Sequence, residues 1–190
     1  MRKQEPCHCK ELHLQQTENT NYALNYEVHD VCNNTFEDEL LGKVHCEYKT
    51  HELTLIRTDR VISYNLGCVV DDILEGVTEI VRGADLIDIT PAQLSLYSSF
   101  NKNAPRYLHL PLIMQDSERK LSKQNHSPAV LDLASPQKLL ITGLKFLNQE
   151  TEDLNEDMSV YKILSKAVDR FCIENISKRP LLMIKLQHSQ

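Results

Sequence analysis

The fold is decided by the central stretch GVTEIVRGADLIDITPAQLSLYSSFNKNAPRYLHLPL, residues 76–112. Its opening part, 77–81, is rich in β-branched residues and ends at Gly83, which is typical of a buried strand rather than a helix. The closing part, 107–112, is again short and apolar, so we predict a second strand there. The two strands bracket the segment that connects them.

The connecting segment carries the start signal of a helix. Threonine suits an N-cap and proline the first helical position, and Thr90 and Pro91 follow in that order. Apolar residues then recur as far as Phe100. A strand, a helix and a strand with short connections predict a parallel α/β unit, whose ligands usually gather beyond the carboxyl ends of the strands. We therefore expect an α/β fold.

The chain divides into three predicted regions around this unit. The first is polar, loop-rich and cysteine-bearing, the second holds the α/β unit with one more strand at 53–56, and the third is helical in pattern. In the third, Ser135-Pro136 and an apolar stripe along 159–171 predict two helices that pack together. The stripe consists of Val160, Ile163, Leu164, Ala167, Val168 and Phe171. The three regions are residues 1–50, 51–127 and 128–190.

The composition is that of an ordinary folded protein. With 190 residues, 41% of them hydrophobic, the chain can bury one core and a small module. No apolar run approaches the roughly 20 residues that span a bilayer, and the N-terminus lacks the apolar stretch of a secretory signal. We therefore expect a cytoplasmic protein with reduced thiols. The net charge of -6 means that a nucleic-acid partner would need local basic groups.

Lysines stand three positions apart in the loop that follows the α/β unit. Lys120 and Lys123 could close over a triphosphate, because a fixed ammonium stabilises the charge that builds up as pyrophosphate leaves. A solvated basic loop is the plain alternative for such a pair.

The lysine loop resembles the second nucleotide-binding motif of class I aminoacyl-tRNA synthetases in its Lys-Leu-Ser-Lys form. Upstream, Tyr64 to Asp72 and Gly76 to Leu86 are similar to the glutamate branch of that family, and His109 to Leu112 continues the match in order. Gln93 and Leu96-Tyr97 agree as well. The resemblance covers about residues 51–175 and implies part of a Rossmann-type catalytic domain.

Within the glutamate branch, Lys120 to His126 is similar to the glutamyl-Q tRNA(Asp) synthetases, because glutamyl-tRNA synthetases usually carry arginine after the second lysine. The resemblance implies a ligase that activates L-glutamate with ATP, as its magnesium complex, and transfers it to queuosine of tRNA(Asp). It implies catalytic roles for Lys120 and Lys123. The ATP contacts that it implies are Lys120, Leu121, Ser122, Lys123 and Gln124.

The resemblance also implies that Tyr64 and Arg82 contact the glutamate substrate. Arginine offers a planar fork for a carboxylate, and a tyrosine hydroxyl can bind a carboxylate or an amine. From spacing alone Arg82 could instead form an ion pair with a nearby carboxylate. We interpret the acidic pair Asp71-Asp72 as a helix N-terminal cap or a surface ion pair. We assign His109 no catalytic role.

A zinc module is the second site that the resemblance implies. Cys7 and Cys9 match its Cys-x-Cys, Cys32 is the natural third ligand, and Tyr26 or His29 could complete a tetrahedron. A degenerated module with free thiols is equally compatible with this spacing.

Complete members of the family begin with a His-x-Gly-His-like motif, and the chain does not contain it. We therefore expect an N-terminally truncated synthetase with impaired activity. The alternatives are a fragment of a glutamyl-tRNA synthetase and a non-catalytic tRNA-binding remnant. The sequence predicts no particular oligomeric state.

Overall fold

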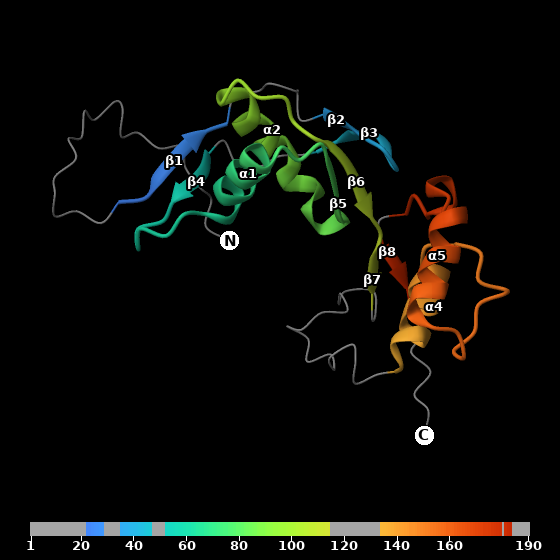
Figure 1. Ribbon diagram of the computed structural model, residues 1–190. Coiled ribbons are helices and arrows are strands. Elements are labelled where there is room, and N and C mark those ends of the chain that lie inside the picture. The colour runs from blue at the N-terminus through green and yellow to red at the C-terminus, as the bar shows by residue number, and fades with distance from the viewer. Residues whose placement is uncertain (1–21, 29–34, 47–51, 115–133, 180, 184–190) are drawn as a thin grey trace. The chain divides into compact units, whose positions relative to one another are not determined.

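A computed structural model describes residues 22–28, 35–46, 52–114, 134–179 and 181–183 (Figure 1). The chain forms two compact units, which are described separately. The first comprises residues 1–81 and 86–108, and the second comprises 82–85 and 109–190. None of the helices in the described part of the chain is long and apolar enough to cross a membrane.

A four-stranded sheet runs in the order β3-β2-β6-β5. Strand β2 (Thr35–Asp38) pairs antiparallel with β3 (Gly42–His45) and parallel with β6 (Arg106–Leu110), which neighbours β5 (Glu79–Gly83). Strands, helices and a parallel pair confirm the predicted α/β class.

The strands β2 and β3 were not predicted from the sequence, which indicated only loops before residue 53. Each is four residues long and mixes apolar with charged side chains, so neither shows a clear period. They gain their support from distant partners, because Phe36 packs edge-on against Tyr107 of β6 at 6.2 Å between ring centroids. Buried Cys46 completes this cluster.

The described part of the first unit contains two α-helices. Helix α1 (Tyr64–Glu75) begins at an N-cap, Ser63, whose hydroxyl accepts from the Leu66 amide, and ends at Gly76 with a left-handed φ of 70°. Helix α2 (Thr90–Ser99) follows the short 3-10 helix η1 (Ala84–Ile89) directly.

The start of α2 differs from the prediction by one residue. Ile89 occupies the N-cap, and Thr90 is already helical, so its hydroxyl donates to the Leu86 carbonyl instead of capping. The 3-10 turn ahead of the helix explains the difference, because its last carbonyls are available to that hydroxyl. Leu96 and Tyr97 of α2 then pack on Val69 of α1 in the core of this unit.

A separate pair of strands flanks these helices. Strand β1 (Leu24–Glu27) pairs antiparallel with β4 (Glu52–Ile56), which confirms the strand expected at 53–56. Leu53 is buried in the same core as Val69 and Leu96. The hydroxyl of Tyr26 joins β1 to α2 through the hydroxyls of Ser95 and Ser99.

The second unit contains the predicted helical region. Helix α4 (Pro136–Phe146) has Ser135 at its N-cap and proline in its first turn, as expected. Helix α5 (Val160–Arg170) lies within the predicted range 159–171 and is capped by Ser159. A short 3-10 helix, η3 (Ile173–Asn175), follows. The helices pack together through Ile141, Ile163 and Leu154, which confirms the predicted contact between them.

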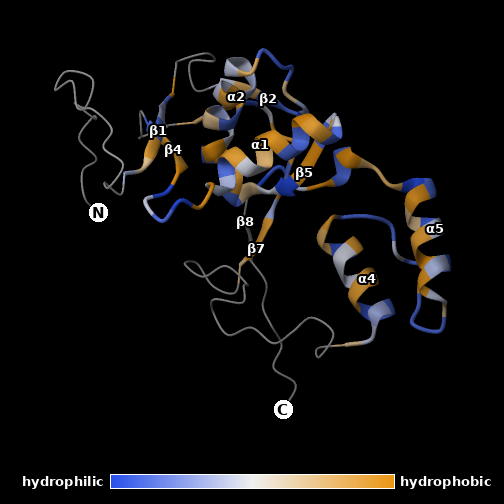
Figure 2. Cartoon of the chain, turned by 60° about the vertical axis from the view of Figure 1, so that its left-hand side comes forward, coloured by the Kyte–Doolittle hydropathy of each residue, from blue (hydrophilic) through white to orange (hydrophobic). Residues whose placement is uncertain are grey.

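The apolar stripe on α5 is only partly buried. Ile163 and Ala167 are buried, whereas the side chain of Val168 is 75% exposed, and Leu164 and Phe171 are also exposed. Figure 2 shows hydrophobic and hydrophilic residues on different sides of α5, as in an amphipathic helix. The face predicted to pack is therefore wider than the face that α4 covers.

The predicted strand 107–112 is interrupted at Pro111. Proline has no N–H for a ladder, and the chain continues as a separate strand, β7 (Leu112–Met114). This strand pairs in parallel with β8 (Leu181–Met183), near the end of the chain.

Candidate functional site

Arg82 is bound by a histidine on the neighbouring strand. It lies near the end of β5, and its Nε donates a hydrogen bond of 3.0 Å to Nε2 of His109 on β6. The two side chains differ in environment: His109 is 1% exposed, whereas Arg82 is half-buried. One side of the guanidinium is thus fixed from within the protein.

A side chain on the residue after Arg82 would crowd its neighbours. A Cβ built on Gly83 would lie 2.5 Å from Oδ1 of Asp85 and 3.2 Å from Cδ2 of Leu112. Glycine therefore lets the Asp85 carboxylate come close to the backbone immediately beyond Arg82. This gives a physical reason for the sequence Arg-Gly-Ala-Asp at this position.

Tyr64 stands at the first position of α1, and its side chain is 63% exposed. The next residue, Asn65, accepts a 3.1 Å hydrogen bond from the buried amide of Gln93 on α2. At the other end of α1 the hydroxyl of Tyr97 donates to Asp72 at 2.9 Å. Both contacts fix the helix that carries Tyr64.

The Asp72 contact corrects the interpretation of the acidic pair. Asp71 and Asp72 lie within α1, near its C-terminal end, and the N-cap is Ser63. A helix N-terminal cap at Asp71-Asp72 was therefore a wrong expectation. Asp72 instead ties α1 to α2 through its hydrogen bond with Tyr97.

The structure describes only some of the predicted site residues. Lys120, Leu121, Ser122, Lys123 and Gln124 lie outside the described residues, as do Cys7, Cys9 and Cys32. Tyr64 and Arg82 belong to different units, so their joint contact with one substrate stays a prediction.

Tyr26 is the one predicted zinc ligand that the structure describes. Its hydroxyl is 2.8 Å from Oγ of Ser95 and also contacts Oγ of Ser99 and the Ser95 carbonyl. Within the described ranges, no three His, Cys, Asp or Glu side chains converge on a point that could hold a metal. The zinc site therefore remains a prediction from the sequence.

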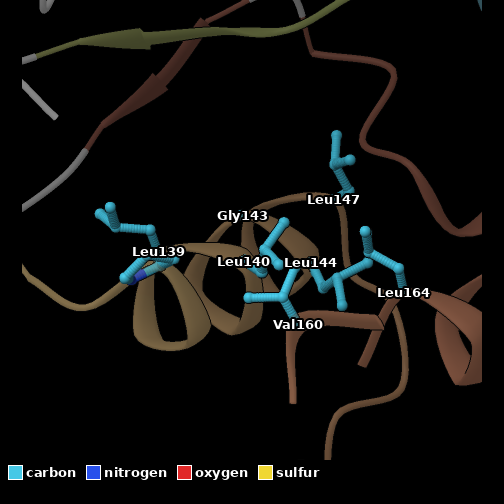
Figure 3. Close-up of a pocket in the computed structure, with 8 residues that line it drawn as sticks. Leu139, Leu140, Gly143, Leu144, Leu147, Val160 and Leu164 are labelled. Atoms are coloured by element: carbon cyan, nitrogen blue, oxygen red, sulfur yellow. The ribbon is translucent and has the colours of Figure 1, made fainter. Parts of the chain in front are cut away.

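A groove in the second unit is lined by apolar side chains alone. The groove, of about 560 Å³, lies between α4 and α5, and Figure 3 draws the side chains that line it. None of these side chains carries a polar atom that could bind a phosphate or a carboxylate. The lining residues are Pro136, Leu139, Leu140, Gly143, Leu144, Leu147, Val160 and Leu164.

The comparisons with known proteins place the chain in one class of protein, the catalytic domains of class I synthetases. The family model for tRNA synthetases class I (E and Q), catalytic domain, matches residues 2–171, and the chain belongs to this family.

Two relatives show which enzymes of the family the chain resembles. The chain is 47% identical over 135 residues to the glutamyl-Q tRNA(Asp) synthetase of Escherichia coli (strain K12), a match that covers 70% of this chain and 44% of the relative. It is 42% identical over 143 residues to the enzyme of that name from Yersinia pseudotuberculosis serotype I (strain IP32953), covering 74% and 43%. The chain thus spans less than half the length of these relatives.

Solved structures agree on the fold. A glutamate-tRNA synthetase from Elizabethkingia anophelis superposes with a TM-score of 0.62 at 18% identity, over 80% of this chain and 34% of that one. A glutamate tRNA ligase from Elizabethkingia meningosepticum gives 0.55 at the same identity, over 76% and 32%. At this identity the likeness concerns the fold alone.

Proposed function

We propose that the chain is the part of a glutamyl-Q tRNA(Asp) synthetase that binds glutamate and the phosphates of ATP. The identity of 47% to the Escherichia coli enzyme of that name is the observation that carries this proposal. The hydrogen bond between Arg82 and His109 supports it, because it fixes an arginine on a strand of an α/β sheet, where ligands of such folds are bound.

The first proposed step is the activation of glutamate in the cytoplasm. An oxygen of the α-carboxylate attacks the α-phosphorus of ATP, the bond from that phosphorus to the bridging oxygen breaks, and pyrophosphate leaves. Arg82 and Tyr64 hold the glutamate, and Lys120 and Lys123 offset the charge on the departing phosphates. Magnesium bound with ATP would share that charge.

The second proposed step transfers the glutamyl group to queuosine of tRNA(Asp). Queuosine supplies the nucleophile, the new bond forms at the activated carbonyl carbon, and AMP leaves. The chain's net charge of -6 requires that the tRNA be met by local basic groups. The lysine loop is one such group.

The test adds the part of the enzyme that the matches to the relatives do not cover. We would fuse that portion of the Escherichia coli relative to this chain and measure glutamate-dependent ATP–pyrophosphate exchange. We expect exchange by the fusion and none above background by the 190-residue chain alone. Labelled glutamate should then transfer to tRNA(Asp) that contains queuosine, and not to the same tRNA without it.

The alternatives give different results in the same assay. A fragment of a glutamyl-tRNA synthetase would charge tRNA(Glu) that lacks queuosine. A non-catalytic remnant would bind tRNA but support no exchange after fusion.

A variant of the fusion tests the lysine loop separately. Lys123→Ala should lower kcat for glutamate activation by about a hundredfold, with a smaller effect on the KM for ATP, because its charge is most useful in the transition state. Unchanged kinetics in a folded variant would remove the loop from the ATP site.

A further inference from the structure

We propose that His109 is a positioning residue, which holds Arg82 by its Nε so that a substrate carboxylate is received by the terminal nitrogens of the guanidinium. The inference rests on the proposed function, because it assigns Arg82 to the substrate. Its starting point is the 3.0 Å hydrogen bond between the two side chains.

The chemistry of the contact fixes the protonation of the histidine. Arginine stays protonated in proteins, so its Nε always donates and Nε2 of His109 must accept. An imidazole that accepts at Nε2 is neutral and carries its proton on Nδ1. A doubly protonated His109 would place two donors and two positive charges against each other.

Burial makes His109 a firm support. Its side chain is 1% exposed, and its neighbours on β6, Tyr107 and Leu108, are also buried. The half-buried Arg82 loses torsional freedom when its Nε is held by such a group. Less conformational entropy is then lost when a ligand binds, which raises affinity without any new contact to the ligand.

The contact also selects the geometry of recognition. A carboxylate can pair with arginine through Nε and one terminal nitrogen, or through the two terminal nitrogens. Because Nε is already bound to His109, the first mode is blocked. The carboxylate therefore has to approach along the end of the guanidinium, which fixes the direction in which the substrate lies.

Two variants of the fused enzyme separate this role from simple filling of space. His109→Leu keeps a buried side chain without an acceptor, and His109→Gln restores an oxygen near the place of Nε2. We expect His109→Leu to raise the KM for glutamate about ten- to hundredfold, the range for a hydrogen bond to a charged group. The KM for ATP should stay within about twofold, and His109→Gln should recover most of the loss.

A double-variant cycle shows whether His109 acts through Arg82. In an Arg82→Lys background, which lacks Nε, the change His109→Leu should add little to the KM for glutamate. Full additivity of the two changes would contradict the proposal.

A measurement on the chain itself needs no catalysis. Nitrogen-15 spectra of the histidine side chains should show Nε2 of His109 without a proton and Nδ1 with one. Arg82→Met should disturb this tautomer. A proton on Nε2 in the parent chain would overturn the positioning proposal.

The two proposals fail in different ways. Absence of glutamate-dependent exchange in the parent fusion would overturn the proposed function. An unchanged KM for glutamate in folded His109→Leu, with exchange intact, would overturn the positioning role alone.

Discussion

A substitution can test whether Arg82 acts through the shape of its guanidinium or through its positive charge alone. Its fork can pair with two carboxylate oxygens while Nε remains on His109, whereas an ammonium provides neither geometry. We expect Arg82→Lys in the fused enzyme to raise the KM for glutamate nearly as much as Arg82→Ala, by about ten- to hundredfold, with a smaller change in kcat.

Steady-state kinetics with glutamate as the varied substrate would check the arginine prediction. Matching thermal melts of the parent and the variants serve as the control for folding. Full activity of Arg82→Lys would show that charge alone suffices at this position.

Cys46 is a second residue whose environment predicts its chemistry. Burial, and to a lesser degree the nearby Asp88, raises the pKa of its thiol from 9.0 to about 11. At pH 8 this leaves about a hundredfold less thiolate than an ordinary cysteine has, and thiolate is the reactive form. We therefore expect alkylation of Cys46 in the folded chain to be at least a hundredfold slower than in urea.

Peptide mass spectrometry after timed exposure to iodoacetamide would measure the rate at Cys46. The half-buried Cys68 and Cys172 provide internal comparisons in the same sample. Equal rates at Cys46 in folded and unfolded chain would show that the thiol is reached without unfolding.

At the scale of elements, α5 offers a matched pair of apolar positions. Ile163 is fully buried between α4 and α5, whereas Val168 on the same helix is 75% exposed. We expect Ile163→Ala to lower the free energy of unfolding by about 2–5 kcal/mol, because it leaves a cavity. The control, Val168→Ala, should change it by less than about 0.5 kcal/mol.

Urea unfolding followed by circular dichroism would measure both free energies. Equal effects at the two positions would mean that a further surface covers Val168 in solution.

The same helix is fastened to the preceding loop by charge. Asp153 accepts hydrogen bonds from Lys166 and Arg170, which lower its pKa from 3.8 to about 2. A depressed carboxyl pKa stabilises the folded state above the unfolded value, and that contribution disappears as pH falls from 3.8 towards about 2. Asp153→Asn should therefore lower the urea midpoint at pH 6, and the difference should shrink as pH falls through about 2.

Comparison of urea midpoints at several pH values and two salt concentrations would check the Asp153 prediction. The pair is exposed, so the difference should be small and should shrink at high salt. A difference in midpoint that does not shrink between pH 6 and pH 2 would point to a cause other than charge.

An element could be predicted from the sequence when the residues that define it lie close together in the chain. Ser135 and Ser159 cap helices within a few residues of themselves, so both helices were predicted with their starts. Strand β2 depends on pairing with β6, far along the chain, and β3 pairs in turn with β2, so both were missed.

The same reasoning applies to the candidate site. Tyr64 and Arg82 were predicted as site residues from motifs, whereas the partner of Arg82 depends on which residues of β5 and β6 lie side by side. His109 was therefore visible as part of a motif and not as a support for Arg82. Likewise, the exposed half of the α5 stripe follows from packing and not from periodicity.

At the scale of the whole molecule, the zinc module is the predicted part that most needs a measurement. If Cys7, Cys9 and Cys32 bind zinc, the chain purified under reducing conditions should carry about one equivalent, since such modules hold a single tetrahedral ion. Cys7→Ser combined with Cys9→Ser should remove it. Elemental analysis decides the matter, with Cys68→Ser as the matched control, and a metal-free parent chain would leave a degenerated module.

The pairing of β7 with β8 has a consequence during protein synthesis. The parallel partner of Met114 is Met183, and Leu181 opens that strand 67 residues after β7 ends. A ribosome that adds about 5–20 residues per second needs about 3–13 s to make this stretch, so β7 waits that long with an open edge. Helices α4 and α5 are made within the interval, so they can form before β8 arrives. In the nascent chain the strand that closes this edge is thus translated after both of these helices.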